Sequence, residues 1–337
     1  KKSLKFKIIK TLAAGDNPSI KKIPKFSAIE VMTGAIIKKP FDTIIPVEQV
    51  QFFPNQAKPE YLIINKKIKK NNFIRFLGSD FKKGETVIKK GEIINSQHIL
   101  AFKTLGIQKV VVKKKPKIVF YTTGNEISNS NRLPNWKVRN SNSYYLKSFL
   151  KNLPFDFIEK KILRDNDLKK FKSEIKRNLK SSNDLILTSG AVSAGKFDFV
   201  PMVIKKFKLK YSFKDVYIRP GKPLMFAKFL NNKAFFGLPG NPISSAACFR
   251  FFVLPYLYFS IEINENKPIN AVLKKPFIKK KNFTRFIKGQ ISFSNKGIAE
   301  FKVQKGQESF RIKPFTKTNA WGLFPSGKRK FKKNDYI

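Results

Sequence analysis

Acidic, basic and glycine-rich segments of this sequence follow apolar runs that have the character of β-strands. The acids are Glu126, Asp165 and Asp198, and the bases are Arg219 and Lys222. The small residues around them leave backbone N–H groups free to approach a phosphate or another oxyanion. Several carboxylates beside a phosphate repel it unless a hard divalent cation lies between them. Mg²⁺ suits oxygen ligands together with substrate phosphate, so we predict a Mg²⁺ and phosphate site. The segments are 122–127 (TTGNEI), 164–166 (RDN), 188–200 (TSGAVSAGKFDFV), 219–223 (RPGKP) and 237–245 (GLPGNPISS).

Each of these segments also has a simpler interpretation. Glycine after a strand is ordinary turn chemistry, and a single aspartate after a strand often caps a helix. The joint pattern favours a binding site, because ligands of open α/β sheets bind beyond the carboxyl ends of the strands. Pro239 and Pro242, on either side of Gly240 and Asn241, would fix where the amides of that loop point.

The elements that must position these segments alternate between strands and helices. This alternation predicts an α/β domain over 115–263, with a parallel-rich sheet and helices on both faces. The expected strands are 118–122, 155–163, 184–188 and 234–237, and the expected helices are 141–153, 167–179, one beginning near 198, and 244–258.

The flanking segments have a different pattern. Short strand-like runs punctuated by proline and glycine predict a small β domain over 1–70. The same kind of pattern over 264–337 predicts a C-terminal β-barrel-like domain. Segment 71–114 predicts the remainder of an N-terminal linker domain, with a helix near 96–105 capped by Ser96 and a strand over 109–112. The predicted fold class is therefore multidomain, α/β plus β.

Composition narrows the classes of function. With 42% hydrophobic residues and 35 Phe, the chain can bury a large core, which argues against disorder. One Cys and one His exclude a disulfide framework, a CxxC zinc site and a histidine cluster, and favour a cytoplasmic location. The net charge of +48 invites a nucleic-acid interpretation, but 60 of the 70 basic residues are Lys and are dispersed. We therefore expect a solvated lysine coat and no specific nucleic-acid partner.

The sequence shows no obvious membrane or export signal. The apolar start is interrupted by Lys5, Lys7 and Lys10, so it lacks the apolar core of a signal peptide. The most apolar stretch, 249–261, contains Pro255 and is too short to span a bilayer, which predicts a soluble protein.

The motifs, in their order and spacing, resemble those of the molybdopterin molybdenumtransferases, the family that includes the gephyrin E domain. The resemblance implies an enzyme that inserts molybdate into adenylated molybdopterin, releases AMP, requires Mg²⁺ and forms the molybdenum cofactor. It also implies a homodimer in which Thr33 lies beside the acidic loops of the partner subunit. The matching segments are 28–35 (AIEVMTGA), 44–50 (IIPVEQV), 122–127, 162–167 (ILRDND), 188–200, 219–227 (RPGKPLMFA) and 237–249 (GLPGNPISSAACF).

The same resemblance implies roles for individual residues. Glu126, Asp165 and Asp198 match the acidic set associated with the metal and with cleavage of the phosphoanhydride. Thr33, Pro239 and Pro242 match positions linked to activity, although pure loop architecture explains them equally well. Residues that match molybdate contacts are Arg219, Lys222, Pro223, Ser244, Arg285 and Ser309. Residues that match the loops around the pterin or nucleotide phosphates are Ser189, Gly190, Ser193, Gly195, Gly240 and Asn241.

The chain departs from the family pattern at several positions. Ala191 stands where the family usually has a second glycine, and Asn125 stands where it has an acid. Asp215 stands where a basic residue is common, and Arg219 replaces a lysine and keeps its charge. The family's Asp-Gly-Tyr motif, whose aspartate belongs to the active site, has no counterpart, so we expect the sequence to be incomplete at its N-terminus. Two alternatives stay open: a molybdopterin-binding scaffold with lapsed catalysis and, less favoured, a basic nucleic-acid-binding protein.

Overall fold

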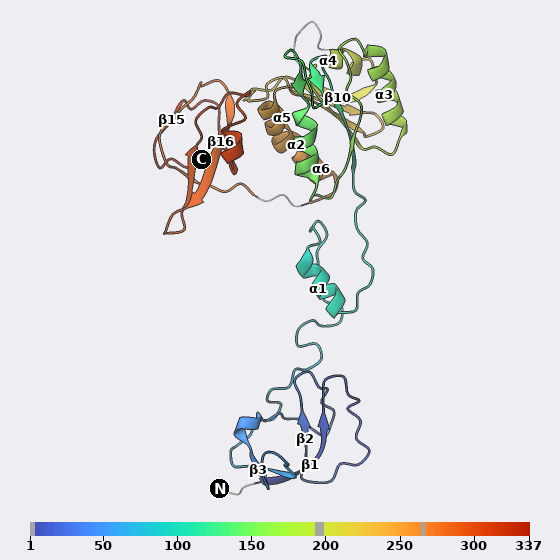
Figure 1. Cartoon of the computed structure of the whole chain (residues 1–337), viewed down its shortest axis with the longest axis vertical. Coiled ribbons are helices and arrows are strands. Elements are labelled where there is room, and N and C mark those ends of the chain that lie inside the picture. The colour runs from blue at the N-terminus through green and yellow to red at the C-terminus, as the bar shows by residue number, and fades with distance from the viewer. Residues whose placement is uncertain (1–3, 193–198, 264–266) are drawn as a thin grey trace. The chain divides into compact units, whose positions relative to one another are not determined.

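The structure is a computed structural model that describes residues 4–192, 199–263 and 267–337 (Figure 1). The chain divides into two compact units, Lys1–Thr86 and Val87–Ile337. The finer division into 1–70, 71–114, 115–263 and 264–337 stays a prediction.

The N-terminal unit contains one four-stranded sheet, in the order β2-β1-β4-β3. Strand β1 pairs parallel with β2 and antiparallel with β4, which also pairs antiparallel with β3. Leu12 and Ile64 are the buried hydrophobic residues among those described in this unit, so its core is small. The β-rich character agrees with the expectation for this part of the chain. The elements are β1 Leu4–Leu12, β2 Ser27–Val31, the 3-10 turn Val47–Gln49, β3 Gln51–Phe53 and β4 Tyr61–Ile64.

The second unit begins with an irregular segment that holds helix α1, Ser96–Thr104. Asn95, not the predicted Ser96, caps it: the Asn95 side chain accepts from the His98 N–H (3.1 Å), and His98 Nδ1 accepts from the Asn95 N–H (3.2 Å). Asn95 caps the helix because its extended backbone lets its side chain reach the backbone N–H of the third helical residue. The strand predicted over 109–112 is wrong, since these residues, all described, form none.

A six-stranded mixed sheet, β10-β12-β13-β9-β5-β8, forms the centre of the second unit. Strands β13, β9, β5 and β8 are parallel, as predicted, whereas β12 runs antiparallel to both β13 and β10. The antiparallel edge was not predicted. The strands are β5 Lys117–Thr122, β8 Asp156–Glu159, β9 Leu185–Ser189, β10 Leu209–Lys214, β12 Met225–Phe229 and β13 Ala234–Leu238, with the short ribbon β6 Ile127–Ser128 and β7 Val138–Arg139 beside them.

Helices cover both faces of this sheet (Figure 1). Ile118 and Phe120 of β5 pack with α2, α5 and α6, whereas Val119 and Tyr121 pack with α3 and α4. This alternation along a fully buried strand is the reason for the near-continuous apolar sequence of β5. The helices are α2 Ser141–Leu150, α3 Leu168–Lys180, α4 Phe199–Ile204, α5 Pro242–Cys248 and α6 Leu254–Ser260, with the π-helical turn Phe249–Val253 between the last two.

The helical stretch Pro242–Ser260 is 19 residues long and contains most of the apolar run 249–261. By length and composition alone it could cross a membrane, but 56% of it is buried inside the unit. Its residues Cys248, Leu254 and Leu257 pack in the core against the sheet, as expected of a core helix.

The C-terminal strands form an open sheet in the order β11-β16-β17-β14, with β18 also paired to β16. The described strands do not close, so the barrel-like prediction is not confirmed; β15 and β19 pair only with each other, and the edge strands are two residues long. Gly289 and Gly322 leave room for the Phe301 ring, which a side chain at either position would strike. The strands are β11 Ile218–Arg219, β14 Val272–Leu273, β15 Phe277–Ile278, β16 Thr284–Phe293, β17 Ala299–Val303, β18 Ala320–Phe324 and β19 Lys330–Phe331, with the 3-10 turn Phe315–Lys317.

Candidate functional site

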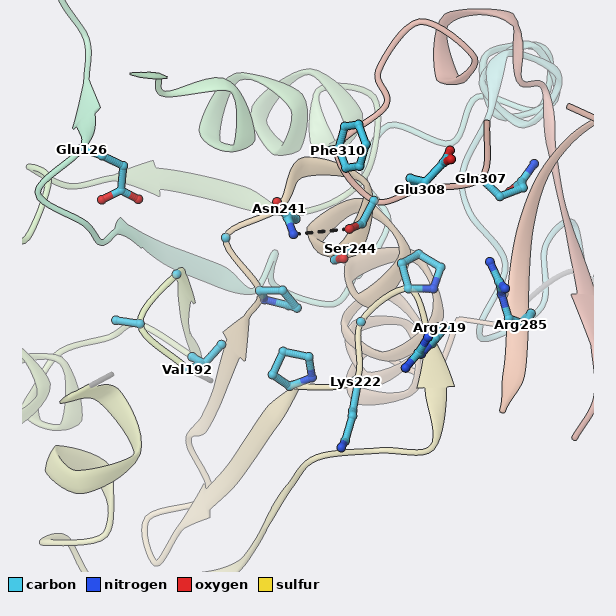
Figure 2. Close-up of a pocket in the computed structure, with 18 residues that line it drawn as sticks. Glu126, Val192, Arg219, Lys222, Asn241, Ser244, Arg285, Gln307, Glu308 and Phe310 are labelled. Carbon is cyan, nitrogen blue, oxygen red and sulfur yellow. Dashed lines mark hydrogen bonds between the residues drawn. The ribbon is translucent and has the colours of Figure 1, made fainter. Parts of the chain in front are cut away.

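A pocket of about 790 Å³ lies in the second unit, where the loops that follow β5, β9, β11 and β13 meet the C-terminal sheet (Figure 2). Its position agrees with the rule that ligands of α/β sheets bind beyond the carboxyl ends of the strands. The lining residues are Glu126, Gly190, Ala191, Val192, Arg219, Pro220, Gly221, Lys222, Pro223, Pro239, Gly240, Asn241, Ser244, Arg285, Gln307, Glu308, Ser309 and Phe310.

The acidic part of the site is built on the loop after β5. Gly124 has a φ of +132°, and a Cβ there would lie 2.5 Å from a Glu126 carboxylate oxygen, so glycine leaves the space that this carboxylate occupies. Arg164 Nη1 donates to the carbonyls of Gly124 (3.0 Å), Asn125 (3.2 Å) and Ile127 (2.8 Å). Arg164 was not predicted as a site residue, because the carbonyls to which it donates lie about forty positions away in the sequence. This guanidinium holds the loop from which Glu126 reaches the pocket.

The predicted metal ligands do not form a complete site among the described residues. Glu126 lines the pocket, whereas Asp165 does not, and Asp198 lies outside the described ranges. Asn125 Oδ1 accepts from the backbone N–H of Asp165 (3.2 Å), which ties the two acidic loops together. In the part of the chain that the structure describes, no three His, Cys, Asp or Glu residues gather as a metal site. The described residues alone therefore supply Glu126 to the pocket but not a complete set of protein ligands for Mg²⁺.

Two glycine loops form the floor of the pocket. Gly190 has a φ of +98°, and a Cβ there would lie 2.7 Å from the Thr123 carbonyl oxygen. Gly240 faces it, with its own Cβ position 3.7 Å from Gly190 Cα. Ser189 is buried behind the floor, where its Oγ accepts from Asn142 Nδ2 (2.6 Å) and donates to the Pro239 carbonyl (3.3 Å). Ser189 therefore fastens one loop to the other and does not line the pocket.

Ala191, next to Gly190, adopts a φ of +52°, in the left-handed region that disfavours side chains. We expect Ala191→Gly to raise the free energy of unfolding by about 0.5–1 kcal/mol, because the strain removed exceeds the entropy gained by the unfolded chain. Urea unfolding measures it. Ala234→Gly, in strand β13, is the matched control with the opposite sign, and a loss of stability in both variants would contradict the prediction.

Two arginines form the basic wall. Arg219 of β11 and Arg285 of β16 are paired positions in a parallel ladder, and Figure 2 shows them beside each other. Burial, and then the positive charge of Arg219, lower the pKa of Arg285. Arg285 Nε is buried without a hydrogen-bond partner. A bound anion would balance the charge of these two adjacent cations and would accept a hydrogen bond from the unsatisfied donor.

An aromatic shelf supports Arg219. Its guanidinium carbon lies 4.4 Å from the centroid of the Phe283 ring, and this ring stacks on Tyr217 at 5.6 Å. Such a contact restrains the orientation of the guanidinium plane. Phe283 was not predicted as a site residue, although it stands two positions before the predicted Arg285, because an uncharged ring has no evident role in binding an anion.

We expect Phe283→Leu to weaken the binding of a tetrahedral oxyanion roughly fivefold, which corresponds to a cation–π contact of about 1 kcal/mol. Isothermal titration calorimetry with molybdate, the oxyanion that the sequence resemblance implies, measures the change. Phe259→Leu is the control, because Phe259 is 83% exposed on α6 and does not line the pocket. Equal affinities of the two variants would show that the shelf does not act on Arg219.

Beside the acidic part and the basic wall, a third wall of the pocket is formed by the loop 307–310 of the C-terminal part. Asn241 Nδ2, from the loop after β13, donates to Ser309 Oγ (3.3 Å), drawn as the dashed line in Figure 2. This bond joins the α/β side of the pocket to the C-terminal side. Gln307, Glu308 and Phe310 were not predicted, although Glu308 and Phe310 stand directly beside the predicted Ser309.

The structure brings most of the predicted residues into one pocket. Pro242, the first residue of α5, is not among the residues that line the pocket, and Thr33 belongs to the other compact unit. Ser193 and Gly195, like Asp198, lie outside the described residues. The predicted residues that line the pocket are Glu126, Gly190, Arg219, Lys222, Pro223, Pro239, Gly240, Asn241, Ser244, Arg285 and Ser309.

The fold and the pocket together define a multidomain α/β protein whose open amides and adjacent cations suit an anionic ligand. Residues 2–106 match the family described as MoeA N-terminal region (domain I and II). Residues 120–258 match the family described as Probable molybdopterin binding domain.

Whole-chain comparisons name the family. The chain is 31% identical over 333 residues to a molybdopterin molybdenumtransferase of Staphylococcus aureus (strain COL), covering 98% of this chain and 77% of that protein. It is also 31% identical to one of Staphylococcus epidermidis (strain ATCC 12228), over 99% and 78% of the two chains. The crystal structure of the molybdopterin biosynthesis moeA protein from Pyrococcus horikoshii OT3 matches with a TM-score of 0.79 and 25% identity, over 99% and 80%. The chain therefore belongs to the molybdopterin molybdenumtransferase family, which confirms the resemblance.

Proposed function

We propose that this chain is the enzyme that inserts molybdate into adenylated molybdopterin, with release of AMP, to form the molybdenum cofactor. One observation carries the proposal. In a chain that belongs to this family, the pocket holds two adjacent guanidinium groups and a floor of glycine loops. Molybdate is a dianion, and adenylated molybdopterin brings further phosphate charge. A basic wall and open amides therefore serve both substrates.

Molybdate binds at the basic wall in this proposal. The planar guanidinium groups of Arg219 and Arg285 suit two oxygens of the oxyanion, and Lys222 adds a point charge. Ser244 and Ser309 contribute hydroxyl donors, and Pro223 shapes the pocket beside Lys222. The unsatisfied Nε of Arg285 supports this assignment, because a buried donor needs a partner.

The adenylated pterin binds toward the glycine floor. The backbone N–H groups of Gly240 and Asn241 would receive phosphate oxygens, together with Ser193 and Gly195, and Gly190 would leave the space for them. Ser189 and Pro239 keep the two loops together. The buried hydrogen bonds of Ser189 support a floor that is preformed before substrate arrives. Pro242, at the first helical position, fixes the entry of α5.

The acidic residues are assigned to the phosphoanhydride end. Glu126, Asp165 and Asp198 belong to this set, and a requirement for Mg²⁺ is part of the proposal. Mg²⁺ keeps several waters and takes substrate phosphate oxygens as ligands, so few protein carboxylates are needed. It would neutralise charge on the scissile phosphates when bound.

The proposal extends to assembly and location. We infer a homodimer in which Thr33 completes the site of the partner subunit, a cytoplasmic location, and no sequence-specific nucleic-acid partner. The four-domain division at 70, 114 and 263 belongs to the same proposal. Analytical ultracentrifugation tests the dimer, and salt-resistant binding to an oligonucleotide would contradict the last point.

The test of the function is AMP release by the purified chain. Adenylated molybdopterin, molybdate and Mg²⁺ are supplied, AMP is quantified by chromatography, and cofactor is measured by activation of an apo-molybdoenzyme. We expect AMP release that depends on molybdate and on Mg²⁺. Tight binding of adenylated molybdopterin without AMP release would overturn the proposal and favour a scaffold with lapsed catalysis.

A further inference from the structure

Lys288, in the middle of β16, is a buried lysine that the proposed chemistry does not use. It is 1% exposed, and its ammonium donates to the carbonyl oxygens of Glu308 (3.2 Å) and Arg311 (3.1 Å). Burial lowers the pKa of Lys288, while the negative charge of Glu308 acts in the opposite direction. The Glu308 carboxylate itself pairs with Arg311 Nε (3.2 Å). Burying an ammonium is unfavourable, so its contacts call for an explanation.

All the polar groups of Lys288 engage one loop, 304–311. Its backbone N–H donates to Gln307 Oε1 (2.9 Å), and its carbonyl accepts from Gln307 Nε2 (2.9 Å) and from the Gln304 N–H (3.0 Å). Residues 304–311 contain no strand or helix that would hold them otherwise. The fixed shape of this loop therefore depends on Lys288 and Gln307.

The same loop forms the third wall of the pocket. Gln307, Glu308, Ser309 and Phe310 line it, and the two carbonyls that Lys288 holds lie on either side of Ser309 and Phe310. Ser309 Oγ in turn accepts from Asn241, on the opposite side of the pocket. A displacement of the loop would move Ser309 away from Asn241 and open the pocket next to Arg285.

We propose that Lys288 is a positioning residue, whose buried ammonium holds the loop 304–311 against β16 so that this loop forms the wall of the oxyanion pocket. The ammonium acts through two backbone carbonyls and touches no substrate. The part of this inference that concerns molybdate rests on the proposed function, whereas the part that concerns the loop does not.

The test replaces Lys288 with methionine, which keeps the length and removes the donors. Hydrogen–deuterium exchange by mass spectrometry is expected to rise roughly tenfold in the loop, with little change in β9 and β13. The KM for molybdate is expected to rise roughly tenfold, with kcat changing less than about twofold, because the wall binds and the acids are untouched. Lys288→Gln keeps an NH₂ donor group without the charge, so its loop exchange and KM are expected to lie between those of the unaltered chain and of Lys288→Met. It replaces the methionine variant if that variant does not fold.

Lys279→Met is the matched control. Lys279 is also buried, at 4% exposure, but its ammonium donates to the carbonyls of Lys280 (3.3 Å) and Phe283 (2.9 Å). Its loss should leave exchange in 304–311 unchanged. Unchanged loop exchange in Lys288→Met, or equal acceleration in both variants, would overturn the proposal, as would a mobile loop with an unchanged KM. Failure of the proposed function would instead appear as absent AMP release in the unaltered chain, and the exchange measurement tests the loop regardless.

Discussion

An Arg219→Met chain is expected to bind molybdate roughly 100-fold more weakly than the unaltered chain and to lose AMP release at micromolar molybdate. Charge-assisted hydrogen bonds contribute about 1.5–3 kcal/mol each, and Arg219 can supply two to one oxyanion. Arg285 cannot compensate, because its position on β16 is fixed by the ladder and its own donors serve the same anion in the unaltered chain. Methionine keeps much of the aliphatic volume, so packing changes little.

Stability separates loss of binding from loss of folding in this variant. Burial lowers the pKa of Arg285 most, and the positive charge of Arg219 lowers it further, so the two guanidinium groups repel each other. Removing one charge relieves that repulsion, while the cation–π contact with Phe283 is lost. We expect these effects to offset each other to within about 1 kcal/mol in urea unfolding. A large loss of stability would mean that Arg219 is a structural residue.

The control for this variant is Arg132→Met, which removes the same charge from an exposed position outside the pocket lining. It should bind molybdate with an affinity within about twofold of the unaltered chain, because an exposed charge is largely screened beyond a Debye length. If both variants lost affinity equally, the dispersed charge of +48 would attract the anion, and the basic wall would have no special role.

The sequence allowed prediction of those pocket residues that lie within short local motifs. RPGKP and GLPGNP contain, within a few residues, groups that the structure places in one pocket, because each loop ends one strand. It did not predict Phe283 or Lys288, whose effects depend on contacts with Arg219 and with the loop 304–311. Such contacts join separate strands and loops, so no local pattern reveals them.

The fold shows the same division. Strands β5 and β9 were predicted from short apolar runs, because both faces of each are buried. Strand β10, with Tyr211 and Phe213 exposed at 58% and 41%, has no such run and was missed. The barrel-like character predicted for 264–337 is not confirmed, for a different reason: short strands separated by turns specify β structure, but closure of a sheet depends on pairings between distant strands.

Substitution of Gly190 by alanine is expected to lower the free energy of unfolding by about 3 kcal/mol. Its φ of +98° disfavours any side chain, and the added methyl would lie 2.7 Å from the Thr123 carbonyl oxygen. That oxygen belongs to backbone and cannot swing away as a flexible side chain would. The Gly190 N–H also donates to the Leu238 carbonyl (2.9 Å), so any shift that makes room for the methyl disturbs the pairing between the two floor loops.

Gly240→Ala is the matched control for this prediction, because it adds the same methyl to the facing loop without strain. The nearest atom to the new methyl would be Gly190 Cα at 3.7 Å, which is ordinary van der Waals contact. Its stability should equal or exceed that of the unaltered chain by up to about 1 kcal/mol, since alanine restricts the unfolded chain. The methyl would nevertheless stand on the pocket floor, so adenylated molybdopterin should bind more weakly to a chain that is fully folded. Urea unfolding and ligand titration on both variants separate the two effects. If Gly190→Ala were as stable as Gly240→Ala, the requirement for glycine at 190 would come from the ligand alone and not from the backbone.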